Sequence, residues 1–528
     1  MNATRHEARA AAALLLPAVV ALSVFYYYPI AQSAIYSFFD LRYSTDWLAS
    51  PFVGFANYVA GLTNPEFWSA FRFTTLFTLG AVFLDFWIGM LFAAATFWVH
   101  RRVRPILRAI IIIPWAIPNV IQASIWRWLL NSDVGLIGDL LVRAGFVETS
   151  PLFLSNQTLA MVSVIWAYVW KGSAISAIFL MAGLATVPRE LHESARIDGA
   201  GVLRRFFAVT VPVMLPTIFV TLLFRTRDAL RVFDMIFGLT QGGPGNATET
   251  LSTFTYKVYF SFNRYGEGSA YAIITFLVIF AVSAVYLRQV SHRFHARERR
   301  RMKTLRIRNT RAHLPVSILI TAAIAVFALL PLYWIFVTSL KVPGTEFRLP
   351  LEYWPAEVSF ESYRQVLGEG FRVQRAILNS LFVSTTAMIG TLFLGSLAAY
   401  TMARLRFHYR FSSLLFIQAA GMIPPIIVIG PTFVLLKNLG LLGSLWAMVL
   451  PNMAYGVPLA ALLMTGYLSG IPYSIEEAAR IDGASWMRIF YSIVLPVAAP
   501  GLFSAGVLSF LGSWGEFMHA FTVSLGIR

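Results

Sequence analysis

Several ionisable side chains stand within long apolar stretches of this 528-residue sequence, where burying a charge is expensive. Groups in such places usually line a polar path or pair with an opposite charge, so the chemistry they offer is binding. Rings and amides in the same stretches could also contact a polar ligand. We therefore expect ligand contacts from Asp85, Gln122, Trp126, Lys171, Arg225, Arg227, Asp228, Asp234, Asn452 and Tyr455. Internal pairing or ordinary packing is the alternative for each of them.

A polar segment occurs twice, at residues 188–216 and 472–500, and we call the copies the first and second loop segments. Thirteen of their 29 aligned positions are identical, including the run Ala-Arg-Ile-Asp-Gly-Ala that ends at Ala200 and at Ala484. In each copy Asp-Gly separates two short helical patterns, and a proline then opens or bends the next apolar stretch. A single copy could be a plain helix stop on a solvated face. Two matched copies favour a helix-turn-helix surface that a partner contacts twice.

The composition indicates that these segments belong to a membrane protein. Hydrophobic residues make up 58% of the chain, charged residues make up 13%, and the mean hydropathy is +0.67. The net charge of +17 comes from short basic clusters between apolar runs, which favours cytoplasmic loops over nucleic-acid binding. The absence of cysteine excludes disulfides and cysteine-ligated metals.

Apolar runs of about 20 residues or more predict an all-α polytopic fold with about eleven membrane spans. We expect spans at 11–37, 72–99, 107–130, 158–184, 208–237, 269–287, 313–340, 377–403, 412–436, 444–469 and 491–513. They form two like-oriented tandem domains, 1–287 and 313–528, joined by a basic linker at 288–312. Basic residues after the second span of each half, at 100–104 and 404–410, put both loop segments, the linker and the N-terminus in the cytoplasm.

The sequence offers no catalytic site of its own. None of its five lysines follows a glycine, so it lacks the Gly-Lys-Ser/Thr loop that holds nucleotide phosphates. It also has no His-rich metal cluster and no serine nucleophile elbow. We therefore expect no enzyme activity, no metal and no cofactor bound by this chain.

The loop segments resemble the EAA loops of bacterial ABC importer permeases. The whole chain resembles two fused permease subunits of the carbohydrate-uptake class, related to maltose and glycerol-3-phosphate importers. The supporting motifs are Arg231-Val232-Phe233-Asp234 in the first half, with Met422-Ile423-Pro424-Pro425 and Trp514-Gly515-Glu516-Phe517 in the second. Ser194 and Gly515 depart from the family pattern, and by that pattern the second domain would lack its last helix.

This resemblance implies the permease component of an ATP-driven importer of sugars or related polyols in the bacterial inner membrane. A cytoplasmic ABC ATPase dimer would dock on the loop segments, and a periplasmic or lipid-anchored solute-binding protein would deliver the substrate. The residues it implies for coupling to the ATPase are Glu193, Ala195, Asp198, Gly199, Ala200, Glu477, Ala479, Asp482, Gly483 and Ala484. The alternatives are an ion-gradient-driven secondary transporter and, less favoured, an integral-membrane glycan transferase.

Overall fold

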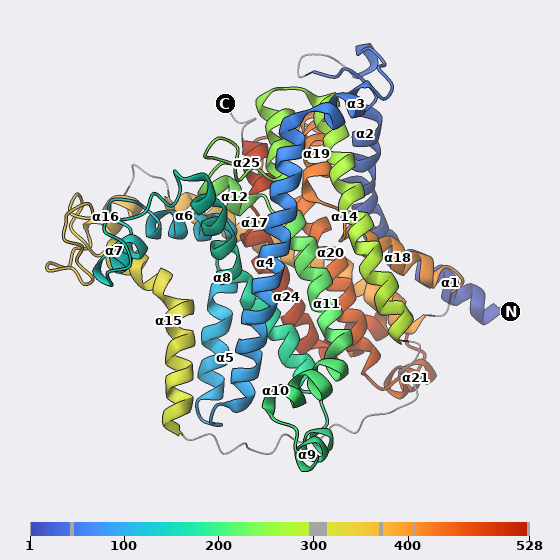
Figure 1. Ribbon diagram of the computed structural model, residues 1–528. Coiled ribbons are helices and arrows are strands. Elements are labelled where there is room, and N and C mark those ends of the chain that lie inside the picture. Colours follow the sequence, from blue (N-terminus) through green and yellow to red (C-terminus); the bar gives the residue numbers. More distant parts are fainter. Residues whose placement is uncertain (1, 43–46, 295–313, 369–372, 406, 525–528) are drawn as a thin grey trace. The chain divides into compact units, whose positions relative to one another are not determined.

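The computed structural model describes residues 2–42, 47–294, 314–368, 373–405 and 407–524 (Figure 1). Within these residues the protein consists of helices and loops, with two isolated β-bridges, Phe39 to Phe52 and Arg42 to Arg264. The predicted all-α fold is confirmed.

The helices of the first half of the chain include long spans and short connecting turns. In chain order they are α1 (Asn2–Leu22), η1 (Ser23–Tyr27), α2 (Tyr28–Tyr36), η2 (Trp47–Ala49), α3 (Ala56–Thr63), α4 (Pro65–Trp98), α5 (Arg104–Ile112), η3 (Ile113–Ala116), α6 (Asn119–Leu129), α7 (Leu136–Arg143), α8 (Gln157–Leu184), α9 (Arg189–Ile197), α10 (Val202–Arg205), η4 (Phe206–Thr210), α11 (Val211–Leu230), α12 (Asp234–Leu239), α13 (Leu251–Tyr256), η5 (Lys257–Ser261) and α14 (Tyr265–Phe294).

The second half of the chain follows the same plan. Its helices are α15 (Leu314–Ser339), α16 (Glu361–Leu367), α17 (Val373–Arg404), α18 (Arg410–Ala420), α19 (Pro425–Asn438), α20 (Trp446–Ser469), α21 (Ser474–Ile481), α22 (Trp486–Ile489), η6 (Phe490–Val494), α23 (Leu495–Val497), α24 (Ala499–Trp514) and α25 (Met518–Ser524). The predicted linker at 288–312 begins within the last turns of α14, and its residues from 295 onward lie outside the described residues.

Eight helices of the described chain are long and apolar enough to cross a membrane. The predicted eleven spans are reached only if three bent helix pairs each count as one span. The predicted spans at 107–130, 412–436 and 491–513 are each broken in the structure, which bends them by 97°, 89° and 81°. Pro118 and Pro424 lie at the first two breaks, because proline lacks an N–H and disfavours helix at the preceding residue, and Pro500 lies in the first turn of α24, just after the third.

Side-chain caps and prolines set where the long spans begin. Asn64 precedes α4 and accepts a hydrogen bond from the Glu66 N–H at 2.9 Å, with Pro65 as the first helical residue. Asn156 caps α8 in the same way, accepting from the Leu159 N–H at 3.1 Å. These caps fix the ends of the two helices that later carry Asp85 and Lys171.

The chain divides into two compact units, and neither is a continuous half of the sequence. Unit 1 comprises residues 1–61, 255–276 and 367–528. Its centre is formed by α17, α20 and α24, which pack on one another, and α1 and α2 pack against α17, α18, α19 and α20. The Ser33 hydroxyl donates to the Ile427 carbonyl at 2.6 Å, which ties α2 to α19.

Unit 2 comprises residues 62–254 and 277–366. In it α4, α8 and α11 pack together, and α15 runs alongside α5 and contacts α6 (Figure 1). The Trp170 indole donates to the Phe327 carbonyl at 3.0 Å and ties α8 to α15. Thus the first span of each sequence half belongs to the unit that contains the later spans of the other half.

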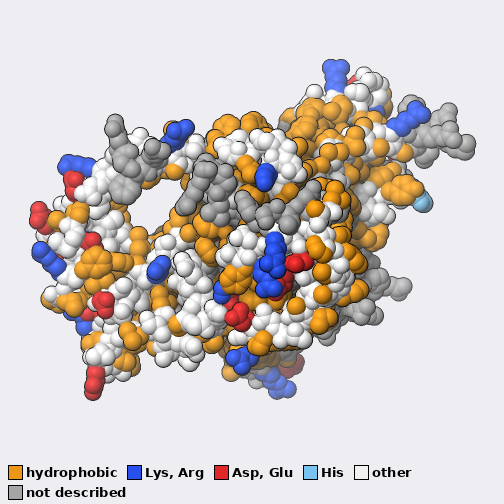
Figure 2. Space-filling model, turned by 90° about the horizontal axis from the view of Figure 1, so that it is seen from above, with side chains coloured by type: hydrophobic (Ala, Val, Ile, Leu, Met, Phe, Trp, Pro, Cys, Tyr) orange, Lys and Arg blue, Asp and Glu red, His pale blue; other side chains and the backbone are white. Residues whose placement is uncertain are grey.

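Hydrophobic side chains cover much of the face seen from above, with charged side chains in small groups between them (Figure 2). Along α4 the large apolar residues Leu76, Leu79, Phe83 and Leu91 are exposed. Exposed apolar surface of this extent on a long helix suits contact with lipid.

Candidate functional site

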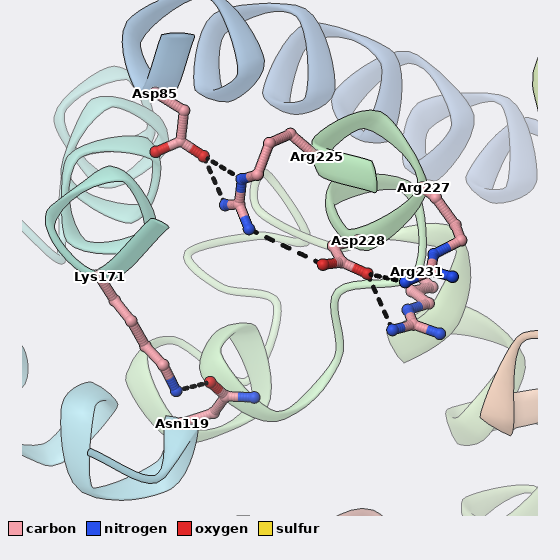
Figure 3. A network of polar contacts seen from close by, with 7 residues as sticks. All are labelled: Asp85, Asn119, Lys171, Arg225, Arg227, Asp228 and Arg231. Carbon is pink, nitrogen blue, oxygen red and sulfur yellow. Dashed lines mark hydrogen bonds and ion pairs between the residues drawn. The ribbon is translucent and has the colours of Figure 1, made fainter. Parts of the chain in front are cut away.

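A cluster of charged side chains, some buried and some partly exposed, lies among α4, α8 and α11 of unit 2 (Figure 3). Arg225 Nε donates to Asp85 Oδ2 at 2.8 Å, and a terminal nitrogen of Arg225 contacts the same oxygen. Asp85 is fully buried and Arg225 is nearly so. A Cβ at Gly172 would overlap both side chains, so glycine is required beside this pair. The pair joins α4 to α11 inside the membrane.

Asp228 extends the cluster along the last turns of α11. Its carboxylate lies 2.8 Å from Arg231, 3.2 Å from Arg227 and 3.8 Å from Arg225, as Figure 3 shows. Three guanidinium groups therefore surround one carboxylate, an arrangement that offsets part of the cost of burying charge. The guanidinium of Arg225 also lies 5.1 Å from the centre of the Tyr168 ring.

Lys171 forms a second part of the cluster, at the break between α5 and α6. Its amine donates to the Ile117 carbonyl and to Asn119 Oδ1, both at 2.6 Å (Figure 3). Asn119 in turn donates to Asp234 Oδ2 at 3.1 Å. Pro118 ends the preceding turn and leaves the Ile117 carbonyl outside helical pairing, where it accepts from lysine.

The charged cluster, defined as Asp85, Lys171, Arg225, Arg227, Asp228, Arg231 and Asp234, has four basic and three acidic groups. One net positive charge remains. Among the described residues, Asp85 Oδ1 has no hydrogen-bond partner, and Lys171 uses two of its three donors. Polar atoms without a partner in the described part of the chain and an excess positive charge thus lie in the same cluster.

The other residues expected along the path occupy packed positions. Gln122 is buried and donates to the Ala167 carbonyl at 2.5 Å, and Trp126 is buried edge-on to Trp170 at 6.1 Å. In unit 1 Asn452 is buried on α20, and the Tyr455 ring lies edge-on to Tyr26 at 4.9 Å. The structure thus gathers Arg225, Asp228 and Asp234 in the charged cluster. The other four predicted residues, Gln122, Trp126, Asn452 and Tyr455, pack in the cores.

The two loop segments have the same backbone geometry. The first loop segment holds α9, α10 and η4, and the second holds α21, α22 and η6. Gly199 and Gly483 end α9 and α21 with φ of 76° and 79°, a conformation that favours glycine. The next N–H groups, of Ala200 and Ala484, donate back to the Ala195 and Ala479 carbonyls at 2.9 and 3.0 Å.

These hydrogen bonds close a Schellman turn, which explains why Asp-Gly-Ala occurs in both copies. A π-helical turn follows at matched positions, Phe206–Thr210 and Phe490–Val494, just before Pro212 and Pro496. The repeat therefore extends from sequence to backbone.

Each loop segment exposes an acid and a large apolar residue. Glu193 and Glu477 are exposed, as are Asp198 and Asp482. Ile197 and Ile481, at the ends of the first helices, are both 86% exposed. An apolar residue so exposed beside a carboxylate is suited to docking in a partner's cleft.

Comparison with known proteins identifies the chain. The family described as "Binding-protein-dependent transport system inner membrane component" matches residues 85–301 and 391–527, which is more than half of the chain. The chain belongs to this family. This permease carries the family region twice, once in each half, and is a transport component of the inner membrane rather than an enzyme.

The relatives of this permease are described as permease proteins of transport systems. It is 38% identical over 279 residues to a sulfoquinovosyl glycerol transport system permease protein of Agrobacterium fabrum, covering 52% of this chain and 88% of the relative. It is 36% identical to a trehalose/maltose transport system permease protein of Thermococcus litoralis, covering 53% and 94%. It is 34% identical to an sn-glycerol-3-phosphate transport system permease protein of Brucella abortus, again covering 53% and 94%.

These comparisons confirm the predicted resemblance to ABC importer permeases and do not favour a secondary transporter. Three polar residues were not predicted as site residues: Asn119, which bridges Lys171 and Asp234; Arg231 of the charged cluster; and Glu476, which is buried on α21. Asn119 directly follows Pro118, and this Pro-Asn pair marks a helix start. Arg231 lies three residues beyond Asp228, a spacing at which side chains on a helix can pair. Glu476 stands next to Glu477, and nothing in the local pattern separates their roles.

Proposed function

We propose that this permease forms the translocation pathway of an ATP-driven importer of sugars or polyols, and that each loop segment receives one subunit of a separate ATPase dimer. The observation that carries the proposal is the matched pair of helix-turn-helix units in the two loop segments, which we call the first and second knobs. Each has an exposed Glu and an exposed Ile on the same backbone turn. Two equivalent docking surfaces suit a symmetric ATPase dimer. A solute-binding protein would deliver the substrate on the opposite side of the membrane.

The proposed orientation places both knobs and the N-terminus in the cytoplasm. The basic clusters at 100–104 and 404–410 follow α4 and α17, on the same side of the membrane as the loop segments by span counting. Cytoplasmic ATP could then power movement of the helices that leave each knob, α11 and α24.

We assign substrate contact to the charged cluster of unit 2. Asp85 and Arg225 of the cluster are buried and its other members are partly exposed. The cluster carries one net positive charge, and Asp85 Oδ1 and one Lys171 donor have no partner among the described residues. Hydroxyl groups would be bound by these polar atoms. The excess charge favours a sugar or polyol that bears an anionic group such as a sulfonate or phosphate.

The docking proposal is tested by removing the exposed acids and measuring how much ATPase co-purifies with the chain. We expect Glu193→Ala together with Glu477→Ala to weaken ATPase retention by about tenfold or more, since docking anchors dominate such interfaces. Glu190→Ala is the matched control, because Glu190 is also exposed on α9 but Ser474 stands at its equivalent position. Normal retention by the double variant would contradict the proposal.

A further inference from the structure

Glu476 points into the protein, although its neighbour Glu477 is exposed. Its Oε1 lies 2.7 Å from Nε of Arg404, the last residue of α17, and both side chains are almost completely buried. The Tyr400 hydroxyl, one turn earlier on α17, donates to Glu476 Oε2 at 3.1 Å. One carboxylate oxygen of Glu476 thus accepts a hydrogen bond from α17, and the other makes a close ion pair with α17 that is not a hydrogen bond.

The same arginine holds the chain just before the second loop segment. Arg404 Nη2 donates to the Ile471 carbonyl at 2.8 Å. Arg404 thus binds the backbone that enters the segment and, through Glu476, the helix α21 that begins it. A guanidinium makes both contacts from nitrogens held in one fixed plane, whereas the single ammonium nitrogen of a lysine would hold them in no fixed relative direction.

Further packing stiffens the second loop segment itself. The Arg480 guanidinium lies 3.7 Å from the centre of the Trp486 ring and 5.2 Å from that of Tyr473. Ala479, Ile489 and Phe490 are buried in one hydrophobic cluster with Tyr400. The helices α21 and α22 are thereby fixed to each other and to α17.

The first loop segment lacks these contacts, although its backbone is the same. His192 stands where the second has Glu476, Val202 replaces Trp486, and Arg205 replaces Ile489. The described side chains of α9 and α10 make no ion pair. His192 Nε2 lies 3.3 Å from Thr210 Oγ1, and burial together with Arg205 lowers the pKa of His192 below its ordinary value. The contact between His192 and Thr210 joins two parts of the first loop segment, and the partly buried Phe206 packs against the hydrophobic cluster that contains Met90 of α4.

We propose that Arg404 and Glu476 are a positioning pair that locks the second loop segment to α17, whereas the first loop segment is held to its neighbouring helices by apolar packing and can adjust its position. The inference rests on the proposed function in one respect, namely that the loop segments dock on an ATPase. The two docking surfaces then act unequally. Movement of the ATPase at the second knob is passed directly to α17, and the first knob adapts its position to the partner.

An ion pair suits this task because both of its charges are buried. Burying Arg404 and Glu476 costs solvation of both charges, and that cost is offset only while the two groups stay close together. Any tilt of α21 away from α17 would leave two unpaired buried charges. An apolar contact of the same size would tolerate sliding. The pair therefore specifies one position of the knob.

Because the chain has no native cysteine, pairs of cysteines can be introduced into the full-length chain and spin-labelled. The distance between the two labels then reports how firmly each knob is held to its neighbouring helix. Labels at Phe393→Cys on α17 and Asp482→Cys report on the second knob, and labels at Leu91→Cys on α4 and Asp198→Cys report on the first. We expect a narrow distance distribution for the second knob and a broader one for the first. Glu476→Gln should broaden the second distribution to the width of the first.

His192→Gln is the matched control, because it changes the equivalent position and should leave the second distribution unchanged. Arg404→Lys keeps the charge but loses the fixed plane of the guanidinium and should give an intermediate width. If Glu476→Gln does not accumulate in membranes, Tyr400→Phe replaces it, since it removes one hydrogen bond and no charge. Folded variants with wild-type widths would overturn the proposal, as would equal widths for the two knobs in the unmodified chain.

A transport measurement separates this inference from the docking proposal. With the ATPase bound, Glu476→Gln should retain the ATPase yet lower the substrate moved per ATP by about fivefold, at the low end of typical coupling effects. Unchanged coupling in this variant would mean that the pair does not transmit movement. Docking is tested separately by measuring ATPase retention in Glu477→Ala, a variant that leaves the pair of Arg404 and Glu476 intact.

Discussion

At the residue scale, Lys171 provides a test of the proposed substrate contact at the charged cluster. Two of its three donors are used within the protein, and the proposal assigns the third to a ligand anion. We expect Lys171→Met to weaken binding of glycerol 3-phosphate by about tenfold to a hundredfold, since hydrogen bonds to charged groups contribute about 1.5–3 kcal/mol. Binding of maltose should change much less. Direct binding or uptake of each compound is the measurement.

Lys437→Met is the control for this comparison, because it removes the same charge from an exposed position at the end of α19. Equal losses for the anionic and neutral compounds would show that Lys171 supports the fold rather than recognising an anion.

Part of the charged cluster could be predicted from single residues. Arg225, Asp228 and Asp234 stand in apolar surroundings, where ionisable groups are rare and need partners. Their pairing could not be predicted, since Asp85 is 140 positions from Arg225 in the chain. The contrast between Glu476 and Glu477 is similar. Both are acids on one polar helix, and only the position of Arg404 separates the buried one from the exposed one.

At the scale of elements, the turn within each loop segment depends on glycine at a position of positive φ. We expect Gly199→Ala to cost about 1–2 kcal/mol, because a Cβ is unfavourable in left-handed backbone. Gly201→Ala is a close control: an added Cβ meets nothing within 4 Å at either site, and only Gly199 has positive φ. For Gly199→Ala, both the temperature of thermal unfolding of the chain and the amount of ATPase retained should fall.

A Gly199→Ala variant as stable and as well bound as Gly201→Ala would mean that the turn does not hold the knob in shape. The comparison isolates backbone conformation, since neither substitution changes charge or fills a cavity.

The helices themselves could be predicted because length and apolarity decide them. The loop turns were also predictable, as Asp-Gly and the following proline mark a helix end and a new start. The sharp bends at Pro118 and Pro424 were not, because proline in an apolar run is compatible with a mild kink as well as with a break near 90°. Packing against neighbouring helices decides between these outcomes.

At the scale of the whole molecule, the sequence repeats in tandem, but the compact units exchange their first spans. Residues 1–61 belong to unit 1 with α17 and α20, and α15 belongs to unit 2 with α5 and α6. A span that is apolar on every side has no distinct apolar face, so its sequence does not show which helix it packs against. Its partners are set by close packing and single hydrogen bonds, such as Trp170 to Phe327, which no local pattern reveals.

The proposed orientation of the whole chain can be tested with single cysteines in the native cysteine-free background. Span counting puts Ser155, before α8, outside and puts Ala8, Asp198 and Asp482 in the cytoplasm. We expect an impermeant thiol reagent added to intact cells to label Ser155→Cys and to spare the other three until the membrane is opened. Asp198 and Asp482 are exposed, so protection would reflect the membrane rather than burial. Labelling of either from outside would place its knob beyond the reach of a cytoplasmic ATPase and would remove the basis for coupling through both loop segments.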